Sequence, residues 1–236
     1  MLVNVKKNTI YFRFFVILLT FNLIISCKST SSYQTTKIEG KKIGVTNEKG
    51  ENEAIVNYVK PYSDNINKDL NSVLAYCPET QDKSKGTWQS NIGNLLAEIT
   101  FELGNPVFQK RENKTIDVCL LNHGGIRAVI PKGDVTTRTA FEVMPFENSL
   151  IIVGLTGKEI KTLAEYIIKE KKPHPLYGMK IYIDKSTLKI NKIEINNLPL
   201  DENRIYYVGT SDYLANGGDN MTFFKESKIK FDLEYK

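Results

Sequence analysis

A short apolar run that stops at a glycine-containing segment constrains the fold of this chain most strongly. The run is IDVCLL, residues 116–121, and the polar segment NHGGIR follows it at residues 122–127. A short β-prone apolar run is typical of a buried strand. We therefore expect a strand whose carboxyl end meets a glycine corner.

A helical pattern precedes this run. Residues 90–104 predict a helix that begins at Ser90 or Asn91 and ends at Gly104. The apolar residues of its predicted core face recur at helical spacing, and they are Ile92, Leu95, Leu96, Ile99 and Leu103. One face of this helix is therefore expected to pack on the core.

More helical and β-prone segments follow the run. Residues 148–155 predict a strand, and residues 156–172 predict a helix that begins with a capping box of Thr156 and Glu159. Further strands are predicted at residues 178–184, 189–195 and 204–214. Because helices and strands mix without a regular strand-helix-strand rhythm, we expect an α+β fold with mixed α/β layers, in a single domain over residues 53–236.

The first residues predict the compartment. Residues 1–26 combine a cationic start, an apolar centre of about a dozen residues and a small residue before Cys27, which is the shape of a secretory signal peptide. The apolar centre is shorter than the roughly 20 residues of a membrane-spanning helix. Residues 24–27 resemble a bacterial lipobox, so we expect a lipidated Cys27, a polar linker over residues 27–52 and an extracytoplasmic protein anchored to a membrane. A soluble protein released by signal cleavage is the alternative.

The charge balance argues against a nucleic-acid partner. The chain of 236 residues has a formal net charge of +5, from 32 Lys and Arg against 27 Asp and Glu. Three of the cations, Lys6, Lys7 and Arg13, lie in the predicted signal peptide. The other basic and acidic residues interleave, whereas nucleic-acid binding is expected to gather basic residues in a stripe.

The chain offers few residues for catalysis or metal binding. Its two histidines are His123 and His174, and His174 lies between two prolines, which predicts an exposed turn. A nucleophilic triad or a dinuclear metal centre needs more convergent ligands. We therefore predict no catalytic residue and no metal site in this chain. Cys77 and Cys119 leave open a disulfide or, for Cys119 in its buried strand, a core thiol.

The glycines of NHGGIR predict a shaped corner. They lack the spacing of a phosphate-binding loop. Gly124 and Gly125 instead allow positive φ angles and a close backbone approach, which turns Arg127 outward from the strand end. A tight turn with a solvated Arg127 is the alternative interpretation.

Two aromatic residues lie in polar loops. Phe146 follows a proline and comes before Asn148, and Tyr213 comes before a Gly-Gly turn and Asp219. For Phe146 alone, burial in the core is the alternative. Together with Arg127, these residues suit a flat heteroaromatic ligand that bears hydroxyl groups, because rings can stack on it and polar side chains can orient it.

Several segments resemble, in order and spacing, the C-terminal domain of the 5'-nucleotidase family. They lie at residues 122–136, 143–160 and 206–224, and residues 89–98 are similar to the helix that precedes these motifs in the family. The resemblance extends over about residues 53–225. It implies the fold of that domain and a role in nucleotide catabolism.

The resemblance also implies roles for the loop residues. It implies that Phe146 and Tyr213 sandwich a nucleobase. Arg127 and Asn148 match positions that contact the base or the sugar, and Asp219 matches the acid that faces the ribose. The expected ligand is therefore a nucleotide or a nucleoside.

The chain departs from the family in two respects. Family members usually carry an N-terminal metallophosphoesterase domain with two metal ions, and the stretch before the first motif here is too short for it and lacks the ligands. Some members also have arginines upstream of the helix, where this chain has Lys83 and Lys85, and a lysine offers a point charge instead of a planar fork.

These departures define the expected function. We expect a recognition domain without a cofactor of its own, which acts with a separately encoded metallophosphoesterase that holds Mn, Zn, Mg or Ca and hydrolyses the phosphate ester. A non-catalytic lipoprotein that binds nucleosides or nucleotides at the surface is the alternative, and a module kept for protein contacts is a third.

Overall fold

The computed structural model describes residues 3–24, 33–46 and 49–234 and divides the chain into two units, Met1–Asn52 and Glu53–Lys236. The first unit contains helix α1 (Val3–Ile24). Among the described residues, no helix is both long enough and apolar enough to cross a membrane. Cys27 lies outside the described residues, so its lipidation and the signal peptide stay predictions.

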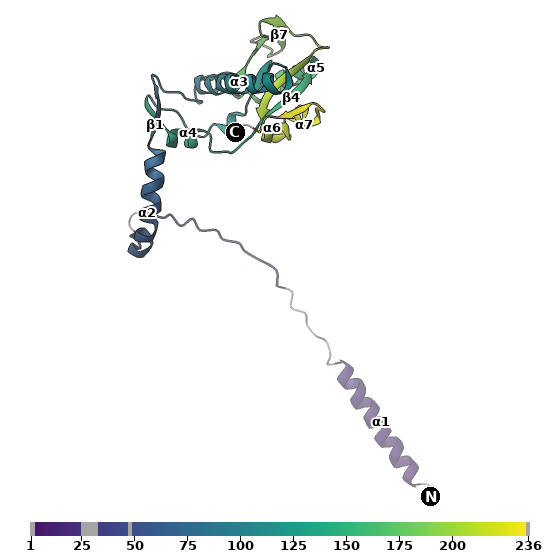
Figure 1. Ribbon diagram of the computed structural model, residues 1–236. Coiled ribbons are helices and arrows are strands. Elements are labelled where there is room, and N and C mark those ends of the chain that lie inside the picture. Colours follow the sequence, from purple (N-terminus) through teal and green to yellow (C-terminus); the bar gives the residue numbers. More distant parts are fainter. Residues whose placement is uncertain (1–2, 25–32, 47–48, 235–236) are drawn as a thin grey trace. The chain divides into compact units, whose positions relative to one another are not determined.

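The second unit holds the rest of the described helices and strands (Figure 1). In chain order they are α2 (Glu53–Leu70), β1 (Val73–Cys77), α3 (Asn91–Glu112), β2 (Val118–Leu120), the short turn η2 (His123–Gly125), β3 (Gly133–Thr136), α4 (Thr137–Val143), β4 (Leu150–Thr156), α5 (Gly157–Glu170), β5 (Leu176–Tyr177), β6 (Met179–Ile183), β7 (Ile190–Ile195), β8 (Leu198–Pro199), β9 (Ile205–Ser211), α6 (Asp212–Ala215), the turn η3 (Gly218–Asn220), α7 (Thr222–Glu226) and β10 (Lys230–Asp232). This mixture of helices with parallel and antiparallel strands confirms the α+β prediction.

The central sheet brings three loops to one edge. Its strand order is β10-β4-β9-β2-β5, with β9 parallel to β2 and antiparallel to β4. Leu150, at the start of β4, pairs with Ser211, at the end of β9. Parallel strands end at the same edge, whereas an antiparallel neighbour begins there. The segments that follow β2, precede β4 and follow β9 therefore meet at this edge.

Alternate residues of the sheet pack on two separate cores. In β4, Ile151 and Val153 contact a cluster that includes Leu163 of α5, whereas Ile152 packs in a cluster with Phe108 of α3. Side chains of a strand point alternately to its two faces, so both faces of β4 are buried. The sheet is thus a layer between α3 and α5.

Local sequence signals set several of these elements as predicted. The Thr156 hydroxyl accepts a hydrogen bond from the Glu159 amide, and a Glu159 carboxylate oxygen accepts one from the Thr156 amide at 2.7 Å. This capping box begins α5. The β-prone segments at residues 178–184 and 189–195 form β6 and β7, and most of the segment at residues 204–214 forms β9. The predicted end of this last strand is wrong, because the Ser211 hydroxyl caps helix α6, which begins at Asp212.

The predicted end of the helix at Gly104 is wrong. The Ser90 hydroxyl caps the start of α3 by accepting from the Gly93 amide, and the helix then continues through Gly104 to Glu112. A Cβ atom at Gly104 would lie 2.5 Å from Cδ2 of Leu150. The glycine is therefore a site of close helix-to-sheet contact instead of a helix stop.

The predicted core face of this helix is also partly wrong. Ile92 is buried, but Ile99 is 40% exposed and Leu103 is 51% exposed. The buried residues of α3 are mostly small or lie elsewhere on the helix, and they are Ile92, Gly93, Ala97, Gly104 and Phe108. Small residues let α3 approach the sheet closely, and this turns the larger Ile99 and Leu103 outward.

The two described cysteines are unpaired. Cys77 and Cys119 are both buried and free, and no disulfide joins them. Burial raises the pKa of the Cys119 thiol to about 12. Cys119 is therefore the core thiol of the two interpretations, and it packs beside Gly209 of the neighbouring strand.

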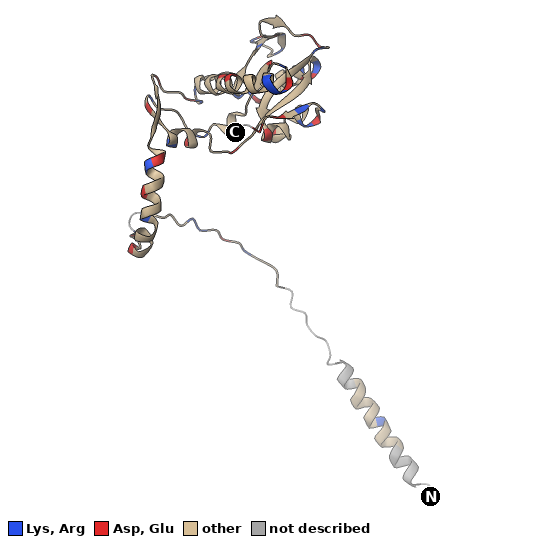
Figure 2. Cartoon of the chain, viewed as in Figure 1, with Lys and Arg blue, Asp and Glu red and all other residues tan. Residues whose placement is uncertain are grey.

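Charged residues of both signs are spread over the second unit. Figure 2 shows Lys and Arg interspersed with Asp and Glu, and neither sign forms a stripe on the described part of the unit in this view. The distribution agrees with the interleaved charges of the sequence.

Candidate functional site

A cleft of about 370 Å³ lies at the edge of the central sheet where the three loops meet. The residues that line this main cleft are Asn122, Gly124, Gly125, Arg127, Phe146, Asn148, Tyr213 and Asp219. All five residues predicted to bind substrate belong to this set. Arg127 follows β2, Phe146 and Asn148 follow Pro145, and Tyr213 and Asp219 follow β9. The fold therefore brings them together from three segments that are distant in the sequence.

The glycine corner works by close approach and not by unusual dihedral angles. Residues His123–Gly125 form the turn η2 directly after β2. The prediction of positive φ angles here is wrong, because neither Gly124 nor Gly125 has one. A Cβ atom at Gly125 would lie 2.8 Å from Oδ1 of Asn122. The missing side chain therefore makes room for the Asn122 amide beside the turn.

Lys83 stabilises this corner by hydrogen bonds from outside the main cleft. Its ammonium group donates to the carbonyl oxygens of Ile126 and His123. Burial, together with the nearby Arg127, lowers the pKa of Lys83. Lys83 does not line the main cleft, and its hydrogen bonds are to the backbone of the corner.

Arg127 and Phe146 form one wall of the main cleft. The guanidinium carbon of Arg127 lies 6.0 Å from the centre of the Phe146 ring, at the limit of a cation-π contact. One guanidinium N–H donates to the Gly124 carbonyl at 3.2 Å, which leaves other donors of the fork for a ligand. Phe146 is 52% exposed, so the interpretation of this ring as a core residue is wrong.

Tyr213 and Asp219 form the other wall. The Tyr213 hydroxyl donates to one carboxylate oxygen of Asp219 at 2.9 Å and accepts from the Asp219 amide at 3.2 Å. The ring lies so close to Gly218 that a Cβ atom there would be 2.5 Å away from it. Tyr213 is 48% exposed. The Gly-Gly turn thus places a half-exposed ring and a carboxylate side by side.

Asn122 is a cleft residue that the sequence reasoning missed. Its amide nitrogen donates to Oδ2 of Asp219 at 2.8 Å, across 97 residues of sequence. It therefore ties the loop after β2 to the loop after β9 and orients the Asp219 carboxylate. The available signal was its position, as the first polar residue after a buried strand and directly before the glycine corner.

Comparison with known families agrees with this geometry. Residues 72–226 match the family described as the 5'-nucleotidase C-terminal domain, and they include every residue that lines the main cleft. The chain belongs to this family.

Relatives and solved structures give the extent of the 5'-nucleotidase likeness. Protein UshA of Escherichia coli is 24% identical over 207 residues, which cover 83% of this chain and 34% of UshA. The trifunctional nucleotide phosphoesterase YfkN of Bacillus subtilis is 28% identical over 63% of this chain and 11% of its own length. A 5'-nucleotidase precursor from Thermus thermophilus is 28% identical, with a TM-score of 0.63 over 78% of this chain and 37% of that chain. The chain thus spans about a third, or less, of the length of these proteins.

Metal ligands do not gather in the main cleft or elsewhere among the described residues of this 5'-nucleotidase domain. The lining of the main cleft supplies one carboxylate, from Asp219, and neither His nor Cys. Across the part of the chain that the structure describes, no group of three or more His, Cys, Asp or Glu side chains is placed to hold a metal ion. The polar groups of the main cleft are suited to recognise a ligand by hydrogen bonds.

A pair of histidines lies behind the corner of this domain. His174 is 5% exposed, so its prediction as an exposed turn residue is wrong. Its ring packs 5.8 Å from the ring of Tyr166, and its Nδ1 accepts from the His123 amide at 3.3 Å. The contacts with Tyr166 and with the turn η2 keep this ring out of solvent. Burial lowers the pKa of both histidines, and the nearby His123 lowers that of His174 further.

The buried histidine predicts a domain that loses stability in acid. Below its ordinary pKa of 6.5, His174 takes up a proton more readily in the unfolded chain than in the folded one, so the free energy of unfolding falls as pH falls. Lys172 opposes protonation of His174, whereas Asp219 and Glu170 favour it, and burial outweighs them. Between pH 7.5 and 5.5, His174 contributes at most about 1.4 kcal/mol per pH unit.

Denaturant unfolding at a series of pH values checks this expectation. The free energy of unfolding of the wild-type chain should decrease from pH 7.5 to 5.5. In His174→Asn, whose side-chain oxygen has the reach of Nδ1 and can accept from the His123 amide but does not titrate, the decrease should be smaller. A wild-type stability that is flat or rises on acidification would contradict the expected effect of burial.

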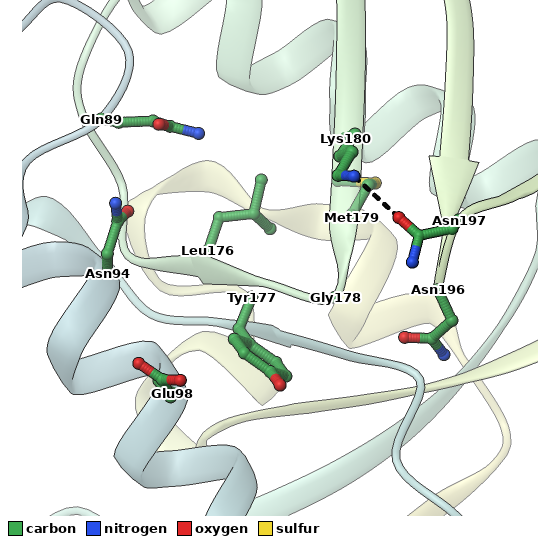
Figure 3. A pocket seen from close by; sticks show the side chains of 10 residues that line it. All are labelled: Gln89, Asn94, Glu98, Leu176, Tyr177, Gly178, Met179, Lys180, Asn196 and Asn197. Atoms are coloured by element: carbon green, nitrogen blue, oxygen red, sulfur yellow. Dashed lines mark hydrogen bonds between the residues drawn. The ribbon is translucent and has the colours of Figure 1, made fainter.

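A second cleft of this domain, about 480 Å³, lies between α3 and the segment from β5 to β6 (Figure 3). None of the predicted site residues lines it. Lys180 already donates to Oδ1 of Asn197 at 2.7 Å, and the Tyr177 ring packs 4.8 Å from the ring of Phe101. Lys180 and Tyr177 are therefore engaged within the protein. We assign the functional site to the main cleft, because all five predicted site residues line that cleft.

Proposed function

We propose that the main cleft binds the nucleoside part of a nucleotide. Phe146 and Tyr213 stack on the base, Arg127 and Asn148 donate or accept hydrogen bonds at the base or the sugar, and Asp219 accepts from the ribose hydroxyls. The observation that carries this proposal is that these five residues, chosen from separate motifs, line one cleft of about 370 Å³. That volume lies within the range of small-molecule sites.

The exposure of the two rings supports a stacked ligand. Phe146 and Tyr213 are each about half exposed, at 52% and 48%, in a cleft that also holds charged groups. A planar base covers such rings and removes apolar surface from water. Stacking on an aromatic side chain contributes about 1 to 3 kcal/mol per base.

Asp219 supports recognition of a ligand with hydroxyl groups. Each of its carboxylate oxygens accepts one hydrogen bond from the protein, one from Asn122 and one from Tyr213. A carboxylate has about four acceptor positions, so the group can still accept from a ligand. The two protein donors hold the carboxylate in place before the ligand arrives.

The chemical step is proposed to occur on a second polypeptide. The family model covers a C-terminal domain, and the aligned region makes up 34% of UshA and 11% of YfkN. We assign hydrolysis of the phosphate ester to a separately encoded metallophosphoesterase, with its divalent Mn, Zn, Mg or Ca and an activated water. The signal-like residues 1–26 and Cys27 support an extracytoplasmic site of action, with a lipid anchor at a membrane.

A hydrolysis assay tests this division of labour. The full chain is purified and incubated with AMP and Mn²⁺, alone and with a metallophosphoesterase that copurifies with it, and the release of phosphate is measured. The chain alone should release none, and the combination should hydrolyse AMP. Hydrolysis by the chain alone would contradict the proposal. Binding of adenosine without any active partner would instead favour the non-catalytic binding protein.

A further inference from the structure

The main cleft has an apolar neighbour. A third hollow, of about 300 Å³, lies between α3 and the start of β4, and we name it the side cleft. It is not the cleft of about 480 Å³ described above. Phe146 and Asn148 line both the main cleft and the side cleft. The two hollows therefore adjoin at residues that are proposed to contact the base.

The walls of the side cleft are mainly apolar. The side chains that give it this character are Ile99, Leu103, Leu121, Met144, Phe146 and Leu150. Ile99 is 40% exposed and Leu103 is 51% exposed, although both are large apolar residues of α3. Apolar surface gathered in a hollow marks a place where a partner group binds. The packing of small α3 residues on the sheet explains why these two side chains are turned outward, but not why they are apolar.

Three hydroxyl groups that line the side cleft already form hydrogen bonds within the protein. The Thr100 hydroxyl donates to the Leu96 carbonyl at 2.8 Å, and the buried Thr210 hydroxyl donates to the Leu120 carbonyl at 2.7 Å. The Ser211 hydroxyl caps α6 by accepting from a backbone amide. Since these hydroxyls are used, recognition in the side cleft rests on apolar contact.

We propose that the side cleft is a subsite for an apolar group attached to the nucleobase. The ligand class is then a nucleoside or nucleotide whose base bears an aromatic or branched aliphatic substituent. This inference rests on the proposed function, because the base must first stack on Phe146. The substituent passes the edge of Phe146 and Asn148 and lies against Ile99 and Leu103.

Calorimetric titration with substituted adenosines tests this subsite. The probes are adenosine itself and three analogues, which carry a benzyl group at N6, a phenyl group at C2 or a phenyl group at C8. At least one analogue should bind about tenfold more tightly than adenosine, because the apolar group leaves water. The tighter analogue identifies the edge of the base that faces the side cleft.

Two variants test whether the higher affinity of an analogue comes from the side cleft. Ile99→Ser and Leu103→Ser should each reduce the affinity of the tighter-binding analogue relative to adenosine and leave the affinity for adenosine itself unchanged. Both side chains are partly exposed, so the variants should keep the wild-type thermal unfolding curve. Ile66→Ser is a matched control, since Ile66 is an apolar residue that is 55% exposed on α2 and lines neither cleft.

The outcomes separate this inference from the proposed function. If adenosine binds and no analogue binds more tightly, the subsite is contradicted and the nucleoside site stands. If the higher affinity of the analogue persists in both α3 variants, the substituent lies elsewhere and the subsite is again contradicted. If neither adenosine nor any analogue binds, the proposed function itself fails.

Discussion

Phe146→Ala and Tyr213→Ala are each expected to weaken the binding of adenosine by about 1 to 3 kcal/mol, which is the contribution of one aromatic stacking contact. Both rings are about half exposed, so their removal should leave the domain folded. Isothermal titration calorimetry measures the affinity, and thermal unfolding measures the stability of the same samples. The expected result is a loss of binding with a nearly unchanged unfolding temperature.

Conservative and distant variants control this experiment. Phe146→Tyr keeps a ring and should retain most of the affinity, whereas Phe146→Leu keeps apolar volume without a flat face and should not. Phe141→Ala removes a phenylalanine that is 61% exposed on α4 and lines neither cleft, so adenosine should bind as to the wild type. Unfolding of Phe146→Ala or Tyr213→Ala would show that the ring supports the core after all.

Asp219→Asn is expected to weaken adenosine binding by about 1.5 to 3 kcal/mol, which is the range for a hydrogen bond to a charged group. The substitution replaces one accepting oxygen with a donating NH₂ group. Asn122 and Tyr213 both donate to this side chain, so one of them then faces a donor. The variant therefore loses an acceptor for the ribose and the arrangement that orients it.

2′,3′-dideoxyadenosine separates these two effects. This ligand lacks the hydroxyl groups that Asp219 is proposed to accept from. The wild type should prefer adenosine over it, and Asp219→Asn should show a smaller preference, which a double-mutant cycle expresses as a coupling energy. An equal preference in both proteins would show that Asp219 only supports the wall of the main cleft.

Short-range signals carried most of the fold prediction. The capping box of Thr156 and Glu159 and the β-prone segments after it are local patterns. The predicted helix and strands form at these places, except that the last strand ends at Ser211, where α6 begins. The errors come from tertiary packing. Gly104 has the sequence signature of a helix stop, but the helix continues because the glycine faces Leu150 across a close contact. A single sequence does not show which residues a helix packs against.

The burial of individual residues was the least predictable property. Ile99 and Leu103 have the spacing of a core face, yet the small residues of α3 pack on the sheet instead. His174 has a polar, proline-flanked setting that is typical of an exposed turn, yet it is buried against Tyr166. In both cases packing against elements that are distant in the sequence decides the burial. Tyr166 of α5 covers His174, whereas Ile99 and Leu103 stay partly exposed.

The residues of the candidate site were identified from local motifs, but their convergence was not. Arg127, Phe146 and Tyr213 belong to three loops, and the sheet order decides whether these loops meet. The parallel pairing of β2 with β9 joins segments about 90 residues apart, which no local pattern specifies. Asn122 was missed for the same reason, since its partner Asp219 becomes its neighbour only through this pairing.

Calorimetric titration of the purified full chain with adenosine, without metal and without a partner protein, tests the central claim most directly. The account predicts saturable binding with a Kd of about 1 mM or tighter, because two stacked rings and a preorganised carboxylate act on one ligand. Inosine and guanosine titrations then rank the bases. A folded chain that shows no saturable binding of adenosine at several times that concentration, or of the other two nucleosides, would contradict the assignment of the main cleft as a nucleoside site.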